Sequence, residues 1–192
     1  MKIETLEIAG IRSTLEALRL PYGLEPRSCL SYSGELYKRQ EDDDYDSTIL
    51  TNTWIKFHKK DLSLLQALVK RGPEHAKCIR GISVYAKITA PIYWWCEMET
   101  YVIGRDRLAS ASTMHVDCKG LSGEELVKAK ANIPMGKELT KIDRFNYQSL
   151  RNIFFQRRNH RLPEWHIFCN WIETLPYAKE LITIENVNNK EN

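Results

Sequence analysis

The stretch from Gly81 to Gly104 constrains the fold more than any other part of the sequence. Its first part, GISVYAKIT, is rich in β-branched and aromatic residues, which predicts a strand over 81–89. Pro91 suits the first turn of a helix, so PIYWWCEMETYV predicts a helix that Gly104 ends. A strand that leads directly into an aromatic helix indicates a domain that combines sheet and helix.

Other segments also show strand patterns. MKIETLEIAG alternates well enough to predict a first strand with Ile3, Leu6 and Ile8 in the core. KELTKIDRF predicts a strand over 137–145, and TILTNTWIKF is compatible with another beside the acidic loop EDDDYD. RDRLASASTMHVD, which follows Gly104, predicts a loop that passes into a strand.

The early helices are predicted from their start signals. Ser13 is expected to cap a short helix over TLEALRL, and Asp61 to cap DLSLLQALVKRG. Ser122 and Glu125 have the spacing of a capping box before the helix SGEELVKAKAN. These signals predict helices between the strands along much of the chain.

The C-terminal third is predicted to be helical. Asn146 is expected to cap NYQSLRNIFFQRRN, a helix with Leu150, Ile153 and Phe154 turned inward. Pro163 is expected to open the helix PEWHIFCNWIETL. A last helix is predicted over 177–184. The chain is therefore expected to form one domain over 1–185, with a polar, disordered tail over 186–192.

Composition excludes several classes of protein. The chain has 192 residues, of which 28 are basic and 25 acidic, so its net charge of +3 makes a nucleic-acid partner unlikely. It has no signal-like N-terminus and no apolar run long enough for a membrane span, which predicts a cytoplasmic protein. Its five cysteines are widely spaced without a C-x-x-C pair, so we expect reduced, mostly buried thiols and no metal site.

A first candidate site follows the aromatic helix. Tyr93, Trp94 and Trp95 occupy consecutive helical positions, so at least one ring is expected to face a pocket or a partner. A ligand platform and a contact between subunits or elements are equally compatible with this run. The polar group that follows could bind a phosphate through guanidinium and hydroxyl donors, or could be a charged turn with an open strand face. Its members are Arg105, Asp106, Arg107, Ser110, Ser112, Thr113 and His115.

A second candidate site is the basic turn FFQRRNHRLPEWH. Arg157, Arg158, His160 and Arg161 lie within five residues, which is more positive charge than a helix C-terminus needs. The turn also leads to a helix N-terminus, where free backbone N–H groups favour an anion. Phosphate and nucleic acid both suit this turn, but the nearly balanced charge of the chain disfavours nucleic acid. No spacing indicates a catalytic triad or a Cys-His pair, so catalytic residues stay unassigned.

The order of these elements resembles the flavin-dependent thymidylate synthases. The matching pieces are Ala90-Pro91-Ile92, Arg105-Asp106-Arg107, Asn146 with Ser149-Leu150, and Glu164-Trp165-His166-Ile167, spread over residues 62–181. Each motif is weak alone, but their common order makes the resemblance moderately specific. It implies an α+β fold with a mostly antiparallel sheet flanked by helices. The S-T-M-H segment also resembles proteins encoded by bacteriophage genomes.

The resemblance implies a homotetramer that binds FAD and deoxyuridine monophosphate between subunits, and possible methylation or another modification of the pyrimidine base. It assigns the cofactor to Arg105, Arg107, Ser110, Arg158 and His160. It assigns the nucleotide to Tyr93, Glu97, Ser112, Thr113, His115 and Arg157. The alternative hypothesis is a catalytically inactive oligomeric module that binds a nucleotide or a protein on the same scaffold.

The sequence departs from the family pattern at its central motif. Asp106 replaces the middle histidine of R-H-R, and Ser112-Thr113 replaces an Asn-Glu pair. A carboxylate near a flavin and a phosphate is unfavourable unless Arg105 and Arg107 neutralise it. The sequence therefore predicts the scaffold of this family with altered chemistry at its site.

Overall fold

The computed structural model describes residues 1–24, 29–30, 55–57 and 59–186. The predicted acidic loop, most of the strand predicted around it, and residues 187–192 of the predicted tail lie outside these residues. The elements, in chain order, are β1 (Lys2–Ala9), α1 (Ile11–Arg19), η1 (Leu20–Tyr22), β2 (Cys29–Leu30), β3 (Ile55–Lys56), α2 (Lys59–Lys70), η2 (Ala76–Gly81), β4 (Ser83–Pro91), α3 (Ile92–Met98), β5 (Arg105–Ser110), α4 (Thr113–Val116), α5 (Gly123–Ala131), β6 (Glu138–Asn146), α6 (Tyr147–Arg157), α7 (Pro163–Glu173) and α8 (Ala178–Leu181).

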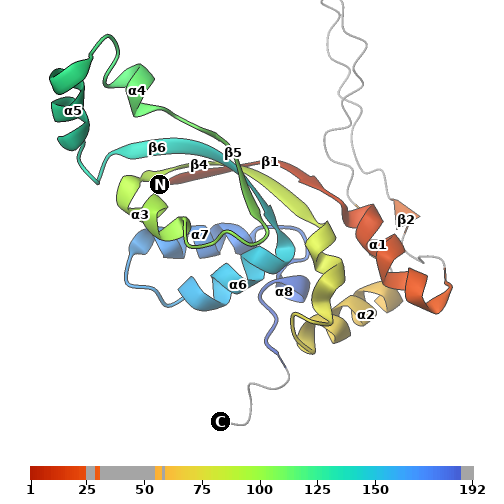
Figure 1. Cartoon of the computed structure of the whole chain (residues 1–192). Coiled ribbons are helices and arrows are strands. Elements are labelled where there is room, and N and C mark those ends of the chain that lie inside the picture. Colours follow the sequence, from red (N-terminus) through yellow and green to blue (C-terminus); the bar gives the residue numbers. More distant parts are fainter. Residues whose placement is uncertain (25–28, 31–54, 58, 187–192) are drawn as a thin grey trace, which may run out of the picture.

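A four-stranded antiparallel sheet in the order β1-β4-β6-β5 organises the molecule. Helices α3, α6, α7 and α8 lie on one side of this sheet (Figure 1). β2 and β3 pair separately as a small second sheet. The prediction of an α+β domain with an antiparallel sheet flanked by helices is confirmed.

An aromatic cluster forms the core between the sheet and the helices. Trp94 and Trp95 are both buried, and the Trp94 ring contacts Trp165 and Phe168 at centroid distances of 4.9 Å and 5.6 Å. The Trp95 indole N–H donates to the backbone oxygen of Leu139 at 3.0 Å. Of the three consecutive aromatic residues, the partly exposed one is Tyr93, and the expectation that one ring faces a pocket or a partner stays a prediction.

The first strand contains an irregularity that the alternation did not reveal. Thr5 pairs with Ala86 and Glu7 with Tyr85, so the register shifts at Leu6. This bulge leaves Leu6 47% exposed, and its predicted place in the core is wrong. The predicted neighbours Ile3 and Ile8 do pack against the core as partly buried residues.

Several predicted caps are also wrong. α1 begins at Ile11, two residues before Ser13, and Gly10 precedes it in a left-handed conformation. Gly10 lies so close to the Gly81 carbonyl that no side chain would fit at this position. Asp61 lies in the first turn of α2, where its buried carboxylate accepts a hydrogen bond from Arg19 Nε at 2.7 Å. Ser122 makes no side-chain capping bond at α5.

The C-terminal helices match the prediction more closely. The Asn146 side chain accepts a hydrogen bond from the Ser149 backbone N–H at 2.8 Å, which caps α6 as predicted. Leu150, Ile153 and Phe154 are buried, and Pro163 opens α7. The predicted last helix is shorter, since α8 ends at Leu181.

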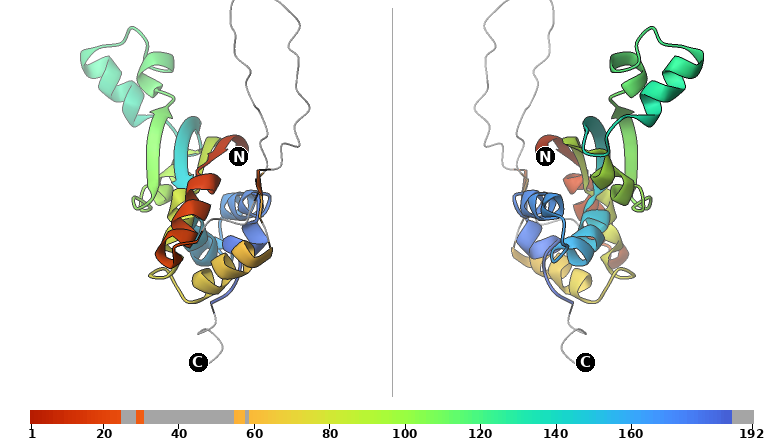
Figure 2. Two further views of the ribbon diagram at one scale, coloured as in Figure 1. Left: turned by 90° about the vertical axis from the view of Figure 1, so that its right-hand side faces the viewer. Right: turned by 90° about the vertical axis from the view of Figure 1, so that its left-hand side faces the viewer.

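An arm made of α4 and α5 connects β5 to β6 and projects from the body of the domain (Figure 2). Neither helix has a buried residue, although Cys118 between them is buried. Lys130 Nζ donates to Thr113 Oγ1, which ties the two helices together. The arm therefore has little core of its own.

No helix in the described part of the chain is both long and apolar enough to cross a bilayer. Among the same residues, no group of histidine, cysteine, aspartate and glutamate could hold a metal ion. Cys118 and Cys169 are buried free thiols, as predicted, but Cys96 is exposed. Burial raises the pKa of Cys169 to about 11, so this thiol stays protonated at neutral pH.

Candidate functional site

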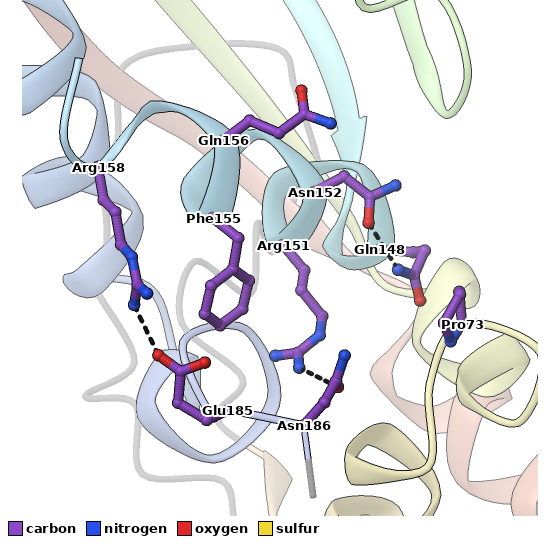
Figure 3. Close-up of a pocket in the computed structure, with 9 residues that line it drawn as sticks. All are labelled: Pro73, Gln148, Arg151, Asn152, Phe155, Gln156, Arg158, Glu185 and Asn186. Atoms are coloured by element: carbon purple, nitrogen blue, oxygen red, sulfur yellow. Dashed lines mark hydrogen bonds and ion pairs between the residues drawn. The ribbon is translucent and has the colours of Figure 1, made fainter. Parts of the chain in front are cut away.

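The candidate site is a groove along α6, made of two adjoining pockets. The first pocket has a volume of about 320 Å³ and lies between α6 and the segment Glu185–Asn186 (Figure 3). It is lined by Pro73, Gln148, Arg151, Asn152, Phe155, Gln156, Arg158, Glu185 and Asn186. The lining is mainly amides and charged groups, so it suits a polar, anionic ligand.

Three amide side chains follow one stripe of α6. Gln148, Asn152 and Gln156 are spaced four residues apart, which places them above one another on one side of the helix. The Gln148 Nε2 group donates to Asn152 Oδ1 at 3.0 Å. The Asn146 cap fixes where α6 begins, and so it fixes the direction in which this stripe points.

Two guanidinium groups share one aromatic ring in this pocket. The Cζ atoms of Arg151 and Arg158 lie 4.7 Å and 4.9 Å from the centre of the Phe155 ring. Arg151 is 5% exposed, and this burial lowers the pKa of its guanidinium. Two cations held side by side attract an anion, and Arg forks match the oxygens of a phosphate.

The C-terminal segment supplies the acceptors that these cations use within the chain. Arg151 Nη1 donates to the Ile182 carbonyl at 2.6 Å, and its Nη2 donates to Asn186 Oδ1 at 2.8 Å. Arg158 Nη1 donates to Glu185 Oε1 at 2.7 Å. Figure 3 shows Arg158 and Arg151 reaching from α6 toward Glu185 and Asn186. The Glu185 carboxylate therefore lies beside Arg158, in a position where the carboxylate or phosphate of a ligand could bind.

The second pocket continues the groove toward the loop after α3. It has a volume of about 260 Å³ and shares Asn152 and Gln156 with the first pocket. Its other lining residues are Thr100, Tyr101, Val102, Ile103 and Ser149. Val102 and Ile103 are 72% and 88% exposed, so this side of the groove has an apolar rim.

Gly104 fixes that loop against the start of α6. Its φ of 73° favours glycine, and an added Cβ would lie 2.5 Å from Asn146 Nδ2. The Gly104 carbonyl accepts hydrogen bonds from the Asn146 backbone N–H at 2.9 Å and from Ser149 Oγ at 2.8 Å. A glycine at this position lets the loop approach closely enough to form the second pocket.

Arg105 and Arg107 belong to a separate ion network at the end of α3. Arg105 contacts the buried carboxylate of Asp143 through Nε at 2.6 Å and Nη2 at 2.5 Å, and its Nη1 donates to the Met98 carbonyl at 2.9 Å. Arg107 reaches Asp143 at 3.3 Å and Glu99 at 2.5 Å. These arginines therefore have acidic partners within the chain.

Glu99 connects this network to Lys141. Lys141 Nζ lies 3.2 Å from Glu99 Oε1 and 4.5 Å from the centre of the Trp95 ring. Partial burial opposes ionisation of Glu99, but hydrogen bonds from Arg107 and Lys141 outweigh it and lower the pKa of Glu99. Burial lowers the pKa of Lys141, and its bond to Glu99 partly offsets this effect.

Asp106 lies on the opposite side of its strand from Arg105 and Arg107. Its carboxylate accepts a hydrogen bond from Arg144 Nε at 2.9 Å, and Arg144 is its cross-strand neighbour on β6. Arg144, and not Arg105 or Arg107, is therefore the cation that neutralises Asp106, because successive residues of a strand point to opposite faces.

Glu97 gathers part of the second sequence-predicted cluster. Its Oε2 accepts hydrogen bonds from Arg157 Nη1 at 3.0 Å and Trp165 Nε1 at 2.8 Å, and His160 Nε2 lies 3.5 Å away. Arg157 also donates to the Tyr101 hydroxyl at 2.7 Å. Since Tyr101 lines the second pocket, this cluster borders the groove.

The other predicted binding residues are dispersed. Tyr93 donates its hydroxyl to Glu164 Oε1, which raises the pKa of Tyr93. Ser112 accepts from the Met114 backbone N–H and caps α4, so its hydroxyl has a structural partner. The exposed Ser110, and Thr113 and His115 with their side chains on the arm, lie outside the linings of the two pockets.

The structure thus brings Glu97, Arg157 and His160 together in one cluster. Arg105 and Arg107 lie together in a second, separate cluster. Among the predicted site residues, Arg158 lines the first pocket. Sequence reasoning missed the amide stripe and Arg151. The spacing of the amides by four residues on a predicted helix was a signal that could have identified them.

Comparisons with known proteins agree with this fold. No family model and no curated protein matches the chain. The flavin-dependent thymidylate synthase ThyX of Helicobacter pylori, solved with FAD and dUMP, is 12% identical with a TM-score of 0.64, over 95% of this chain and 98% of that one. The UMP/dUMP methylase PolB of Streptomyces cacaoi, bound to 5-Br dUMP, is 12% identical with a TM-score of 0.59, over 96% and 95%. The chain therefore has the fold of the flavin-dependent thymidylate synthases.

Proposed function

We propose that this chain is a diverged relative of the flavin-dependent thymidylate synthases that binds FAD and a pyrimidine deoxynucleotide along the α6 groove. The observation that carries the proposal is the pair of guanidinium groups, Arg151 and Arg158, beside a stripe of amides in a pocket of about 320 Å³. Phosphates, ring carbonyls and ring N–H groups are the ligand features that this set of donors and acceptors recognises.

The fit of the two ligands follows from the lining. Arg158 and Arg151 suit a phosphate of either ligand, and Asn152 and Gln156 can bind ring edges from the boundary between the two pockets. The exposed rim of Val102 and Ile103 suits an apolar ring face. A bound flavin would carry electrons, while the protein would orient the reactants and neutralise phosphate charge.

The residues predicted from the sequence enter the proposal with different roles. Arg157 and His160, held by Glu97 beside Tyr101, are proposed to close the groove on the α7 side. Arg105 and Arg107 are proposed to act on a ligand only if it replaces part of their contact with Asp143 and Glu99. Ser110, Ser112, Thr113, His115 and Tyr93 are proposed to reach a ligand from another copy of the chain.

A second function, a nucleotide-binding module without catalysis, is favoured by one specific observation. Both arginines of the Arg105-Asp106-Arg107 motif have carboxylate partners in the chain, and Asp106 is paired with Arg144. A motif satisfied in this way has fewer free donors for chemistry on a ligand. Flavin-dependent conversion of a pyrimidine nucleotide by the purified protein would exclude this second function.

The oligomeric part of the proposal is a homotetramer. Its motivation is the projecting α4–α5 arm, which exposes Met114, Val116 and Val127 by 43%, 75% and 68%. Apolar groups on an extension with little core of its own can be buried against another subunit. Light scattering coupled to gel filtration is expected to give four times the 22.4 kDa chain mass, and a monomer would refute this part.

The experiment that tests the binding proposal is the visible spectrum of the protein after incubation with FAD and removal of free FAD by gel filtration. The wild type is expected to retain about one flavin per subunit, and Arg158→Ala to lose it. Arg161→Ala is the matched control, since Arg161 is an exposed cation of the same turn that does not line the pocket. Equal retention by all three proteins would refute the assignment of Arg158.

A further inference from the structure

Gln148 presents a buried hydrogen-bond acceptor without a partner to the first pocket. The side chain lines the pocket and the residue is 7% exposed. Its Oε1 has no hydrogen-bond partner among the described residues, although its Nε2 is bonded to Asn152. Since buried polar atoms are nearly always paired, such an atom in a pocket indicates a place for a ligand donor.

The Gln148 amide is paired with its neighbour on α6. Gln148 Nε2 donates to Asn152 Oδ1, and Gln148 Oε1 faces away from Asn152, as Figure 3 shows. The donors of the nearby cations are directed elsewhere, from Arg151 to Ile182 and Asn186 and from Arg158 to Glu185. No donor of the described residues therefore occupies Gln148 Oε1, which keeps its capacity to accept a hydrogen bond.

The charge of the pocket limits what that donor can be. Arg151 and Arg158 outweigh the single carboxylate of Glu185, so the lining carries a net positive charge and favours a donor on a neutral or anionic molecule. A ring N–H is neutral, rigid and planar, and it loses little conformational entropy when it binds. The proposed ligands share one such group, because uracil and the flavin ring both contain an imide N–H.

We infer that Gln148 is the specificity-determining residue of the first pocket, and that its Oε1 accepts a hydrogen bond from the imide N–H of the bound ring. The inference rests on the proposed function, which supplies the two candidate rings. According to this inference, Gln148 selects rings that carry an imide N–H and rejects rings that are methylated at that nitrogen. A site that hydrogen-bonds a ligand N–H rejects an analogue that lacks it, because its buried acceptor is then left unpaired.

The test compares each ligand with its N3-methyl derivative by isothermal titration calorimetry. dUMP against 3-methyl-dUMP, and FAD against 3-methyl-FAD, distinguish the nucleobase from the flavin as the source of the N–H. The wild type is expected to bind one of the unmethylated ligands about tenfold to a hundredfold more tightly than its methylated form. This comparison needs no variant, so it does not depend on the folding of a mutant.

The variant Gln148→Leu then tests the residue. It keeps a similar volume and removes the acceptor, so the methylated and unmethylated ligands are expected to bind within about twofold of each other. Gln66→Leu is the matched control, since Gln66 is a partly buried glutamine of α2 that lines neither pocket, and it is expected to keep the discrimination.

The outcomes separate the inference from the proposed function. Binding of dUMP or FAD by the wild type without discrimination against the methylated form overturns the inference and leaves the proposed function intact. Full discrimination by Gln148→Leu also overturns it. Failure of both dUMP and FAD to bind refutes the proposed function, and the inference falls with it.

Discussion

Replacing Asp143 by alanine is expected to destabilise the fold strongly, because it removes the carboxylate that Arg105 needs. Asp143 is fully buried and Arg105 is 8% exposed, and they are joined by two contacts of 2.6 Å and 2.5 Å. Removing one partner of a buried ion pair costs about 3–5 kcal/mol. Arg105 keeps its bond to the Met98 carbonyl and a 3.5 Å contact with Glu99, so we expect a loss of about 3 kcal/mol.

Urea unfolding followed by far-UV circular dichroism measures this loss. With a slope of about 2 kcal/mol per molar urea, the midpoint is expected to fall by about 1.5 M. Glu4→Ala is the control, since Glu4 lies on β1 in an exposed pair with Lys87 at 3.9 Å, and a change within about 0.5 kcal/mol is expected. A loss of unfolding free energy below about 1 kcal/mol for Asp143→Ala would refute the view that Arg105 is held mainly by its contacts with acidic groups of its own chain.

Three further predictions concern the groove and its supports. Glu185→Gln releases Arg158 from its 2.7 Å contact and is expected to tighten FAD binding by up to about fivefold, whereas Glu173→Gln, on an exposed part of α7, is expected to leave the affinity unchanged. The pKa of Glu99 is lowered in the folded state, so its contribution to stability is full above its ordinary value of 4.5 and lost as the pH falls through the folded-state pKa. The stability difference between wild type and Glu99→Gln, measured by urea unfolding at a series of pH values, is therefore expected to shrink on acidification; a constant difference would contradict the ion network. Gly104→Ala forces a side chain into a left-handed conformation against the Asn146 amide and is expected to cost about 2 kcal/mol of unfolding free energy, and an unchanged unfolding midpoint would contradict this geometry.

The helices and strands near the centre of the chain were predictable because their signals are local. Pro91 and Pro163 mark helix starts, Asn146 caps α6, and β-branched residues identify β4. The position of Leu6 was not predictable, since a bulge depends on the register with β4 and not on the alternation within β1. The start of α1 depends similarly on a close approach between Gly10 and Gly81.

The candidate site was predictable in part. The sequence indicates that Arg105 and Arg107 form a charged group, but their acidic partner Asp143 comes from β6, 36 residues after Arg107, and local patterns do not identify that pairing. The amide stripe of α6 has a local signal, but its role depends on the C-terminal segment that closes the pocket at Glu185. Tertiary contacts determine which charges are free for a ligand.

The central claim is that the α6 groove is a ligand site, and a crystal structure of the protein grown with FAD and dUMP tests it most directly. The account predicts ligand density between α6 and the segment Glu185–Asn186, with a phosphate on Arg158 and a ring edge at Gln148. Density for either ligand elsewhere on the chain, with the groove unchanged and the Arg158–Glu185 contact intact, would contradict it.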